Sequence, residues 1–252
     1  MRNLQVFFLA LIWLAVSGCS TTELDRAKDR MKPITRLAVV SFEILQDQPP
    51  GTNKLNGARA FGILSSFSSR EEIQAMARHS YAKLVQELRR KLNKDVLSLK
   101  EVLKNPFFQS LYVEKIGQFD QRTVIRNGVE IVSVKGMFDE ILFRNLSTYE
   151  RQQLAAHLGV DGFIEFMAFQ KIERGVNLKS KPNGFGFRYK THSKIKVYDV
   201  QTLNPVLILE SDKGPLSRLS SSVDGVSPRE GLSKVSSESV VDSIERILSD
   251  SI

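Results

Sequence analysis

Apolar and polar residues switch between strand spacing and helix spacing along the chain. The run Leu37-Ala38-Val39-Val40 lies at the centre of residues 34–45 and predicts a strand that is buried on both faces. A capping box formed by Ser69 and Glu72 then precedes a stripe of apolar residues at helical spacing. The members of this stripe are Ile73, Ala77, Tyr81, Leu84, Leu88 and Leu92. We therefore expect a strand followed by a long amphipathic helix that ends near Asn93.

The middle of the chain predicts shorter elements. Residues 96–99 predict a short strand, and Asn105-Pro106 predicts the start of a second helix, with proline in its first turn. Asn127-Gly128 between two β-rich runs predicts a hairpin over residues 123–131. A second capping box, formed by Ser147 and Glu150, begins a helix that Gly159 ends.

The last third of the chain predicts an antiparallel meander. Residues 160–169 form an apolar strand, Asn183-Gly184 marks a hairpin tip, and residues 193–200 and 206–210 continue the sheet. Residues 211–226 are Ser-rich and predict a loop, and Ser227-Pro228 begins a final helix. The patterns together predict an α/β fold, a two-layer or three-layer sandwich whose mixed sheet ends in an antiparallel meander and is flanked by helices. We expect one domain over residues 34–252.

A long segment over residues 46–69 lacks a regular pattern and contains Pro49-Pro50-Gly51, which predicts a loop. Loops of this length are usually functional or mobile. Phe61, Ile63 and Phe67 are unusually apolar for such a segment. They predict either a lip that contacts a partner or side chains that pack back onto the domain.

The amino-terminal residues 1–18 have the parts of a secretory signal peptide: Arg2, an unbroken apolar run from Val6 to Val16, and small residues before Cys19. As a helix this run reaches only about 16 Å, half of the roughly 30 Å hydrocarbon core. Val16-Ser17-Gly18-Cys19 resembles the lipobox of bacterial lipoproteins. That resemblance implies cleavage before Cys19, acylation of its thiol and amino group, and, because serine follows, transfer to the outer membrane. An ordinary secretion signal with an incidental cysteine is the alternative.

Residues 19–33 then predict a polar tether between the lipid and the domain. Cys19 is the one cysteine of the chain, so the sequence offers no disulfide framework and no thiolate metal site. The net charge is +8, but the basic residues are scattered and no denser run than Arg89-Arg90-Lys91 occurs. Together with export, this scatter argues against a nucleic-acid partner.

Catalytic and cofactor motifs are not evident in the sequence. His79, His157 and His192 stand alone, without zinc-binding spacing, and no nucleophile elbow or phosphate-binding loop occurs. We therefore expect no metal, no cofactor and no enzyme. Asp139-Glu140, or Asp161 with Glu165, could serve as the carboxylate pair of a cell-wall hydrolase, the least favoured interpretation.

Three stretches carry a resemblance to a known family: residues 154–169 (LAAHLGVDGFIEFMAF), 174–189 (RGVNLKSKPNGFGFRY) and 194–208 (KIKVYDVQTLNPVLI). They resemble the bacterial outer-membrane lipoproteins related to the curli secretion channel. Relatives by fold include activators of peptidoglycan synthases, a lipoprotein of Pel polysaccharide export and the amino-terminal domain of the Tol periplasmic component. The resemblance implies an α/β sandwich, often assembled into rings, with an export or assembly task and no catalysis.

We therefore expect a non-catalytic lipoprotein, held at the outer membrane by lipid on Cys19 and facing the periplasm, that acts as a scaffold or accessory in envelope assembly or export. Its partner would be an envelope protein or peptidoglycan, contacted through residues 46–69 and the 174–190 hairpin with Phe185, Phe187 and Tyr189. A homo-oligomer is possible. A channel subunit that forms an oligomeric ring is the alternative, although residues 211–230 are too polar for a second membrane-spanning hairpin.

Overall fold

The computed structural model describes residues 29–47, 70–116, 123–126, 129–177, 185–211, 216–220 and 228–250. Its strands are β1 Arg36–Asp47, β2 Asp95–Val96, β3 Thr123–Arg126, β4 Val129–Ser133, β5 Gly162–Asn177, β6 Phe185–Asp199, β7 Pro205–Glu210 and β8 Leu216–Ser220. Its helices are α4 Arg70–Leu92, α5 Leu99–Lys104, α6 Pro106–Ile116, α7 Glu140–Arg144, α8 Thr148–Leu158 and α9 Pro228–Asp250.

All described strands belong to one mixed sheet, in the order β3-β4-β1-β5-β6-β7. Within it β1 is parallel to β5 and β2, and the remaining neighbours are antiparallel. The short strand β8 pairs with the first half of β6, and β7 pairs with its second half. The sheet is open, with β3 and β7 at the two ends of the path. The expected mixed sheet with a terminal antiparallel meander is therefore confirmed.

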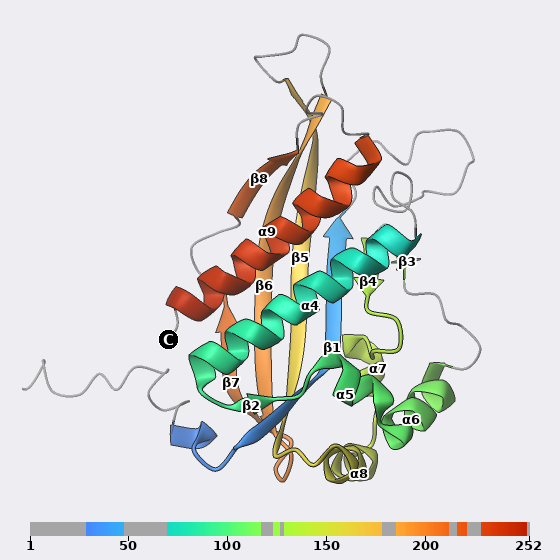
Figure 1. Ribbon diagram of the computed structural model, residues 1–252, viewed down its shortest axis with the longest axis vertical. Coiled ribbons are helices and arrows are strands. Elements are labelled where there is room, and N and C mark those ends of the chain that lie inside the picture. The colour runs from blue at the N-terminus through green and yellow to red at the C-terminus, as the bar shows by residue number, and fades with distance from the viewer. Residues whose placement is uncertain are drawn as a thin grey trace, which may run out of the picture.

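Two long helices, α4 and α9, lie side by side across one face of the sheet (Figure 1). Side chains on this face of β1 and β5 meet α4: the Phe42 ring lies 5.6 Å from the Tyr81 ring and 5.0 Å from the Phe166 ring. The Tyr81 hydroxyl donates to the Val39 carbonyl at 3.1 Å. The apolar stripe predicted for the first long helix is the stripe that α4 buries, with Leu92 half-buried at its end.

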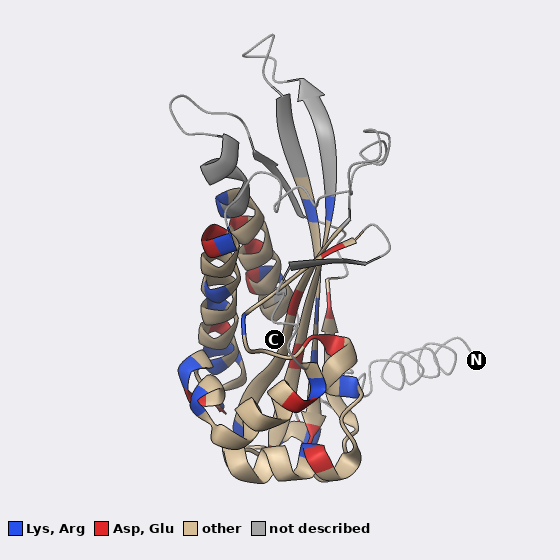
Figure 2. Cartoon of the chain, turned by 90° about the vertical axis from the view of Figure 1, so that its right-hand side faces the viewer, with Lys and Arg blue, Asp and Glu red and all other residues tan. Residues whose placement is uncertain are grey.

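The shorter helices cluster at the end of the sheet where β1 and β5 begin, and α7 lies against the face opposite α4 and α9 (Figures 1 and 2). Phe143 of α7 packs edge-to-face on Phe163 of β5, with 5.5 Å between the ring centroids. The fold is thus two layers, with only the short α7 beginning a third.

Capping residues set the bounds of several helices. The box of Ser147 and Glu150 begins α8, and Gly159 ends it in the left-handed conformation at φ 64°, as predicted. The hairpins at residues 123–131 and 174–190 also form, as β3–β4 and β5–β6. Gly162 is the first residue of β5. A Cβ at this position would lie 2.7 Å from the Leu37 side chain and 2.9 Å from the Tyr198 carbonyl, so the close packing here requires glycine.

Two sequence predictions are wrong. The strand expected over residues 96–99 ends at Val96, because Ser98 and Glu101 form a capping box that begins α5. The loop expected over residues 211–226 contains β8, which pairs with β6. In addition, the sequence analysis did not predict α7, because it interpreted Asp139 and Glu140 as a pair of acids. Asp139 is instead the N-cap of α7, and its carboxylate accepts from the Leu142 N–H at 2.7 Å.

Candidate functional site

The open face of β5, β6 and β7, opposite α4 and α9, is the most distinctive surface among the described residues. Cross-strand register places Met167 beside Lys194 and Phe169 beside His192. Lys194 forms an ion pair with Glu210 of β7. A depression of about 300 Å³ opens here between these side chains. We call this surface, formed by Met167, Phe169, His192, Lys194, Ile208 and Glu210, the open face.

Two large apolar side chains on the open face are exposed to solvent. Phe169 is 37% exposed and Ile208 is 50% exposed, although both belong to regular strands. Cross-strand register also sets Lys171 directly opposite Lys190. Phe169 pairs with His192 and Ile208 with Lys196, so the two apolar side chains are four residues apart in register on one face, and together they make that face a candidate for contact with a partner.

Beneath α7 the same face holds a cluster of buried charges. Lys196 lies between two carboxylates, 3.1 Å from Glu140 and 3.8 Å from Glu165. Glu165 also accepts from the Tyr198 hydroxyl at 2.8 Å. Burial raises the pKa of Glu165, and the Tyr198 hydrogen bond and the Lys196 charge oppose that shift. These pairs fasten α7 to the sheet, since Glu140 is the first residue of that helix.

Glu43 of β1 completes this cluster. Its carboxylate is 5% exposed and accepts from the Glu140 backbone N–H at 3.4 Å. Burial raises the pKa of Glu43 to about 7, with further contributions from the neighbouring acids Asp139, Glu140 and Glu165. A carboxyl group with a pKa near neutrality changes charge within the physiological range, and ionised Glu43 would add a negative charge beside Asp139, Glu140 and Glu165.

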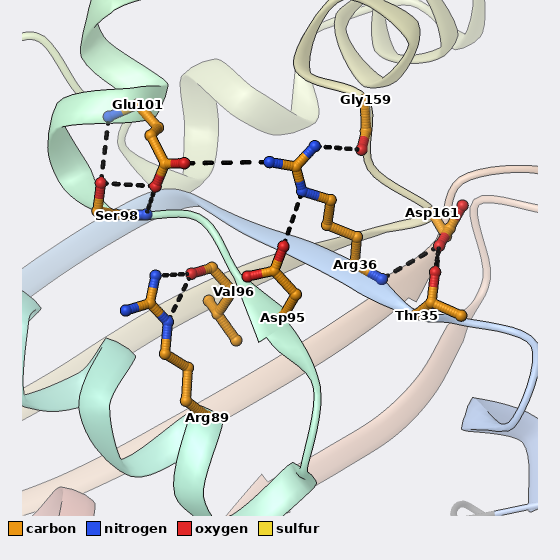
Figure 3. A network of polar contacts seen from close by, with 9 residues as sticks. All are labelled: Thr35, Arg36, Arg89, Asp95, Val96, Ser98, Glu101, Gly159 and Asp161. Carbon is orange, nitrogen blue, oxygen red and sulfur yellow. Dashed lines mark hydrogen bonds and ion pairs between the residues drawn. The ribbon is translucent and has the colours of Figure 1, made fainter.

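Asp161 and Glu165, one of the two acid pairs considered for a hydrolase, do not lie close together. Asp161 precedes β5 and accepts from the Thr35 hydroxyl at 2.6 Å and from the N–H groups of Thr35 and Arg36 at 3.0 and 3.1 Å (Figure 3). These bonds lower the pKa of Asp161. Glu165 lies four residues further along an extended chain, roughly 13 Å away at ~3.3 Å per residue. Glycosidase carboxylates lie about 5–9.5 Å apart, so this spacing does not suit the reaction.

The three histidines lie on separate elements. His79 is exposed on α4, His157 of α8 stacks on Phe107 with 4.4 Å between ring centroids, and His192 lies on the open face. Within the described part of the chain, His, Cys, Asp and Glu side chains nowhere gather in a group of three that could hold a metal ion. Among the helices that the structure describes, none is long and apolar enough to span a bilayer.

The residues predicted to contact a partner have different outcomes. Cys19, Phe61, Ile63 and Phe67 lie outside the described residues, and Phe185 and Phe187 begin β6 with side chains outside them. Tyr189 is fully buried, so its side chain does not reach a partner. Phe169 and Ile208 were missed, because both belong to apolar strands whose exposed face the sequence alone does not indicate.

Comparison with known proteins gives only weak likenesses. No protein-family model matches the sequence, and the curated proteins contain no match to it. Among solved structures, a homolog of the neuraminyllactose-binding hemagglutinin from Helicobacter pylori is similar with a TM-score of 0.42 and 5% identity, over 86% of this chain and 84% of that one.

Two further structures are similar at lower scores. The carboxy-terminal domain of LpoB from Salmonella enterica has a TM-score of 0.30 and 10% identity, over 75% of this chain and 93% of that one. The lipoprotein GNA1162 from Neisseria meningitidis has a TM-score of 0.32 and 12% identity, over 84% of this chain and 98% of that one. All three scores are below 0.5, so we draw no conclusion about this chain from them.

Proposed function

We propose that this chain is a lipid-anchored, non-catalytic accessory protein of the bacterial envelope, which binds a partner protein through the open face. The observation that carries the binding role is the exposure of Phe169 and Ile208 within regular strands of the sheet. The lipid anchor rests on the apolar leader and Cys19, which lie outside the described residues.

The occupant of the open face is proposed to be a protein segment with apolar and acidic side chains. The apolar part would cover Phe169 and Ile208, and the acidic part would pair with the exposed Lys171. Packing of exposed apolar side chains is the usual centre of a protein interface, and a charged rim sets its specificity.

Site-specific crosslinking in living cells tests the binding role. A photo-crosslinking amino acid at position 169 or 208 is expected to capture one envelope protein, and the capture is expected to disappear when the other position is changed to serine. Position 149 on α8 is the control, since Tyr149 is 69% exposed on a different surface. The same adducts from all three positions, or none from positions 169 and 208, would contradict the proposal.

Other adducts would support a different partner class. Adducts with a second copy of the chain, together with detergent-resistant rings, would favour the oligomeric channel subunit. Adducts with glycan strands would favour direct binding to peptidoglycan.

The anchor has a test of its own. Mass spectrometry of the chain isolated from cells is expected to show a diacylglyceryl group on Cys19 and cleavage after Gly18. Cys19→Ala is expected to leave the leader in place and to abolish the lipid. A processed chain with an unmodified Cys19 thiol would contradict the anchor.

A further inference from the structure

A group of lysines gathers at the end of the molecule where β1 begins. Lys91 is in the last turn of α4, Lys94 directly precedes β2, and Lys100 and Lys104 are on α5. Figure 2 shows Lys and Arg at intervals along α4 and on the segment that follows it. We call the group of Lys91, Lys94, Lys100 and Lys104 the basic end.

The carboxylates of this region are already bonded to other groups. Arg36 Nε lies 2.9 Å from the Asp95 carboxylate, and Glu101 accepts from the Ser98 N–H and hydroxyl, both at 2.7 Å (Figure 3). The Ser98 hydrogen bonds also lower the pKa of Glu101, so its negative charge is held in place within the capping box.

The other cations of the region are bonded as well. Arg89 Nε donates to the Val96 carbonyl at 2.8 Å, and Arg90 forms an ion pair with Glu87. The lysines of the basic end, in contrast, have no ion-pair partner among the residues that the structure describes. Lys100 and Lys104 are exposed, and Lys91 and Lys94 are half-buried. The end therefore presents cations that the fold itself does not neutralise.

The basic end lies where the chain enters the domain from its amino-terminal segment. The Asp95 N–H donates to the Thr35 carbonyl at 3.2 Å, which places Lys94 next to the start of β1. Met31 and Ile34 are buried in the core, so the chain is fixed to the domain from that point. Nine residues lie between Cys19 and Asp29, and the ten steps along the chain span at most about 35 Å.

We propose that the basic end binds the anionic phospholipid headgroups of the membrane that holds the lipid on Cys19. The inference rests on the proposed anchor, which brings this end within reach of the bilayer surface. Each lysine near an anionic surface contributes about a five-fold gain in occupancy, and the attraction falls off within a Debye length of about 10 Å. In this orientation the basic end of the domain would face the bilayer, and the β5–β6 hairpin would point away from it.

Lysine acetylation measured by mass spectrometry tests the inference. The full-length chain purified from cells is mixed with vesicles of phosphatidylcholine alone, or of phosphatidylcholine and phosphatidylglycerol. On the anionic vesicles Lys100 and Lys104 are expected to react about five-fold more slowly than on neutral vesicles. High salt is expected to restore their rates. Lys171 and Lys234 are the control lysines, since both are exposed and Lys171 lies nine residues along β5 from its start.

A charge-removing variant adds a second measurement. Lys100→Gln with Lys104→Gln is expected to return Lys91 and Lys94 to their rates on neutral vesicles, while Lys171→Gln with Lys234→Gln leaves them protected. Equal rates on both vesicle types, or equal protection of Lys171 and Lys234, would overturn the inference. Protection by free inorganic phosphate to the same extent would also overturn it, because a membrane surface would then not be needed.

The same samples separate this inference from the anchor. Flotation with neutral phosphatidylcholine vesicles measures insertion of the lipid on Cys19 alone, because the surface of these vesicles has no net charge that could attract the basic end. A chain that floats but shows no protection on anionic vesicles would refute only the basic end. A chain that is protected on anionic vesicles but does not float with neutral ones would refute only the anchor.

Discussion

Strand β5 carries two phenylalanines, Phe166 and Phe169, on opposite faces of the sheet. Phe166 is 1% exposed and stacks on Phe42 beneath α4, with 5.0 Å between the ring centroids. Phe169 is 37% exposed, beside His192 on the open face. The same residue type in the same strand thus has two roles. The face covered by α4 and α9 stabilises the fold, whereas the open face leaves apolar surface available.

A cluster of neutral polar side chains is buried on the covered face. Under α9, Gln170 donates to the Thr191 hydroxyl and the Ser236 carbonyl, each at 3.1 Å, and accepts from the Ser236 hydroxyl at 2.7 Å. Gln46 donates to the Gln170 side-chain carbonyl at 2.6 Å. These polar side chains are neutral and bonded to one another. On the other face Glu43 and Glu165 are buried carboxyl groups, and burial raises the pKa of Glu43 to about 7.

The largest expected effect tests the two phenylalanines directly. Phe166→Ala should lower the free energy of unfolding by about 3–5 kcal/mol, because it leaves a cavity against Phe42. Phe169→Ala, its matched control, should lower it by about 1 kcal/mol or less, since the ring is already partly in water. Urea unfolding followed by circular dichroism measures both. Equal losses would show that the open face contributes to the core as much as the covered face does.

Glu43 gives the next effect through pH. Its raised pKa means that the folded chain binds more protons than the unfolded chain between about pH 4.5 and 7. The free energy of unfolding should therefore fall as the pH rises through this window, by on the order of 2 kcal/mol. Glu43→Gln should remove this contribution, matching the wild type near pH 4.5 and exceeding its stability above pH 7.

Urea titrations at a series of pH values measure this effect. Glu245→Gln on the exposed surface of α9 is the control, and it should retain the slope of the wild type. If the unfolding free energy of Glu43→Gln depends on pH in the same way as that of the wild type, Glu43 is ionised in the folded chain at neutral pH.

Gln170→Ala should have a smaller effect on the covered face. It removes the Gln170 acceptor of Gln46, which keeps the Ser236 hydroxyl at 3.0 Å, and it removes the bonds of Gln170 to Thr191 and Ser236, so it should cost about 1–2 kcal/mol of unfolding free energy. Lys171→Ala at the adjacent exposed position should change that free energy by less than about 0.5 kcal/mol. Hydrogen exchange of the amides in α9 provides an independent readout. Protection of α9 unchanged in Gln170→Ala would show that this cluster does not hold the helix.

The smallest effect on stability belongs to Ile208→Ser, at about 0.5 kcal/mol or less, because the side chain is half exposed. The same variant should abolish the crosslink from position 169 to the partner. Loss of the crosslink without loss of stability would separate binding from folding on this face. A stability loss as large as that of Phe166→Ala would instead place Ile208 in the core.

Local signals in the sequence predicted most of the elements. Capping boxes, Asn-Gly turns and helical stripes indicated α4, α8 and both hairpins, because each depends on neighbouring residues alone. Residues 96–99 were misread as a strand because Val96 and Leu97 before Ser98 and Leu99 after it are apolar. The capping box that ends the strand depends on Glu101, which lies outside this run. The strand β8 was missed since its pairing with β6 is a tertiary contact that its Ser-rich sequence does not signal.

The candidate site was harder to predict than the fold. Residues 160–169 are apolar on both faces, and only the position of α4, α9 and α7 decides that Phe163 is buried and Phe169 is exposed. Glu43 and Glu165 were predicted as strand residues, but their raised pKa depends on burial under α7, which the sequence did not indicate. Tyr189 was expected at a partner contact, but it lies in the core.

The pairing of β1 with β5 also affects the order of folding. Leu37 pairs with Gly162, so β1 can form this strand pair only after β5, from the second half of the chain, is present. Native contacts between such distant residues slow folding, typically to milliseconds or longer. An emerging chain would therefore remain without its central strand pair until β5 has been synthesised. For the exported lipoprotein proposed above, this delay would keep the chain extended during translocation.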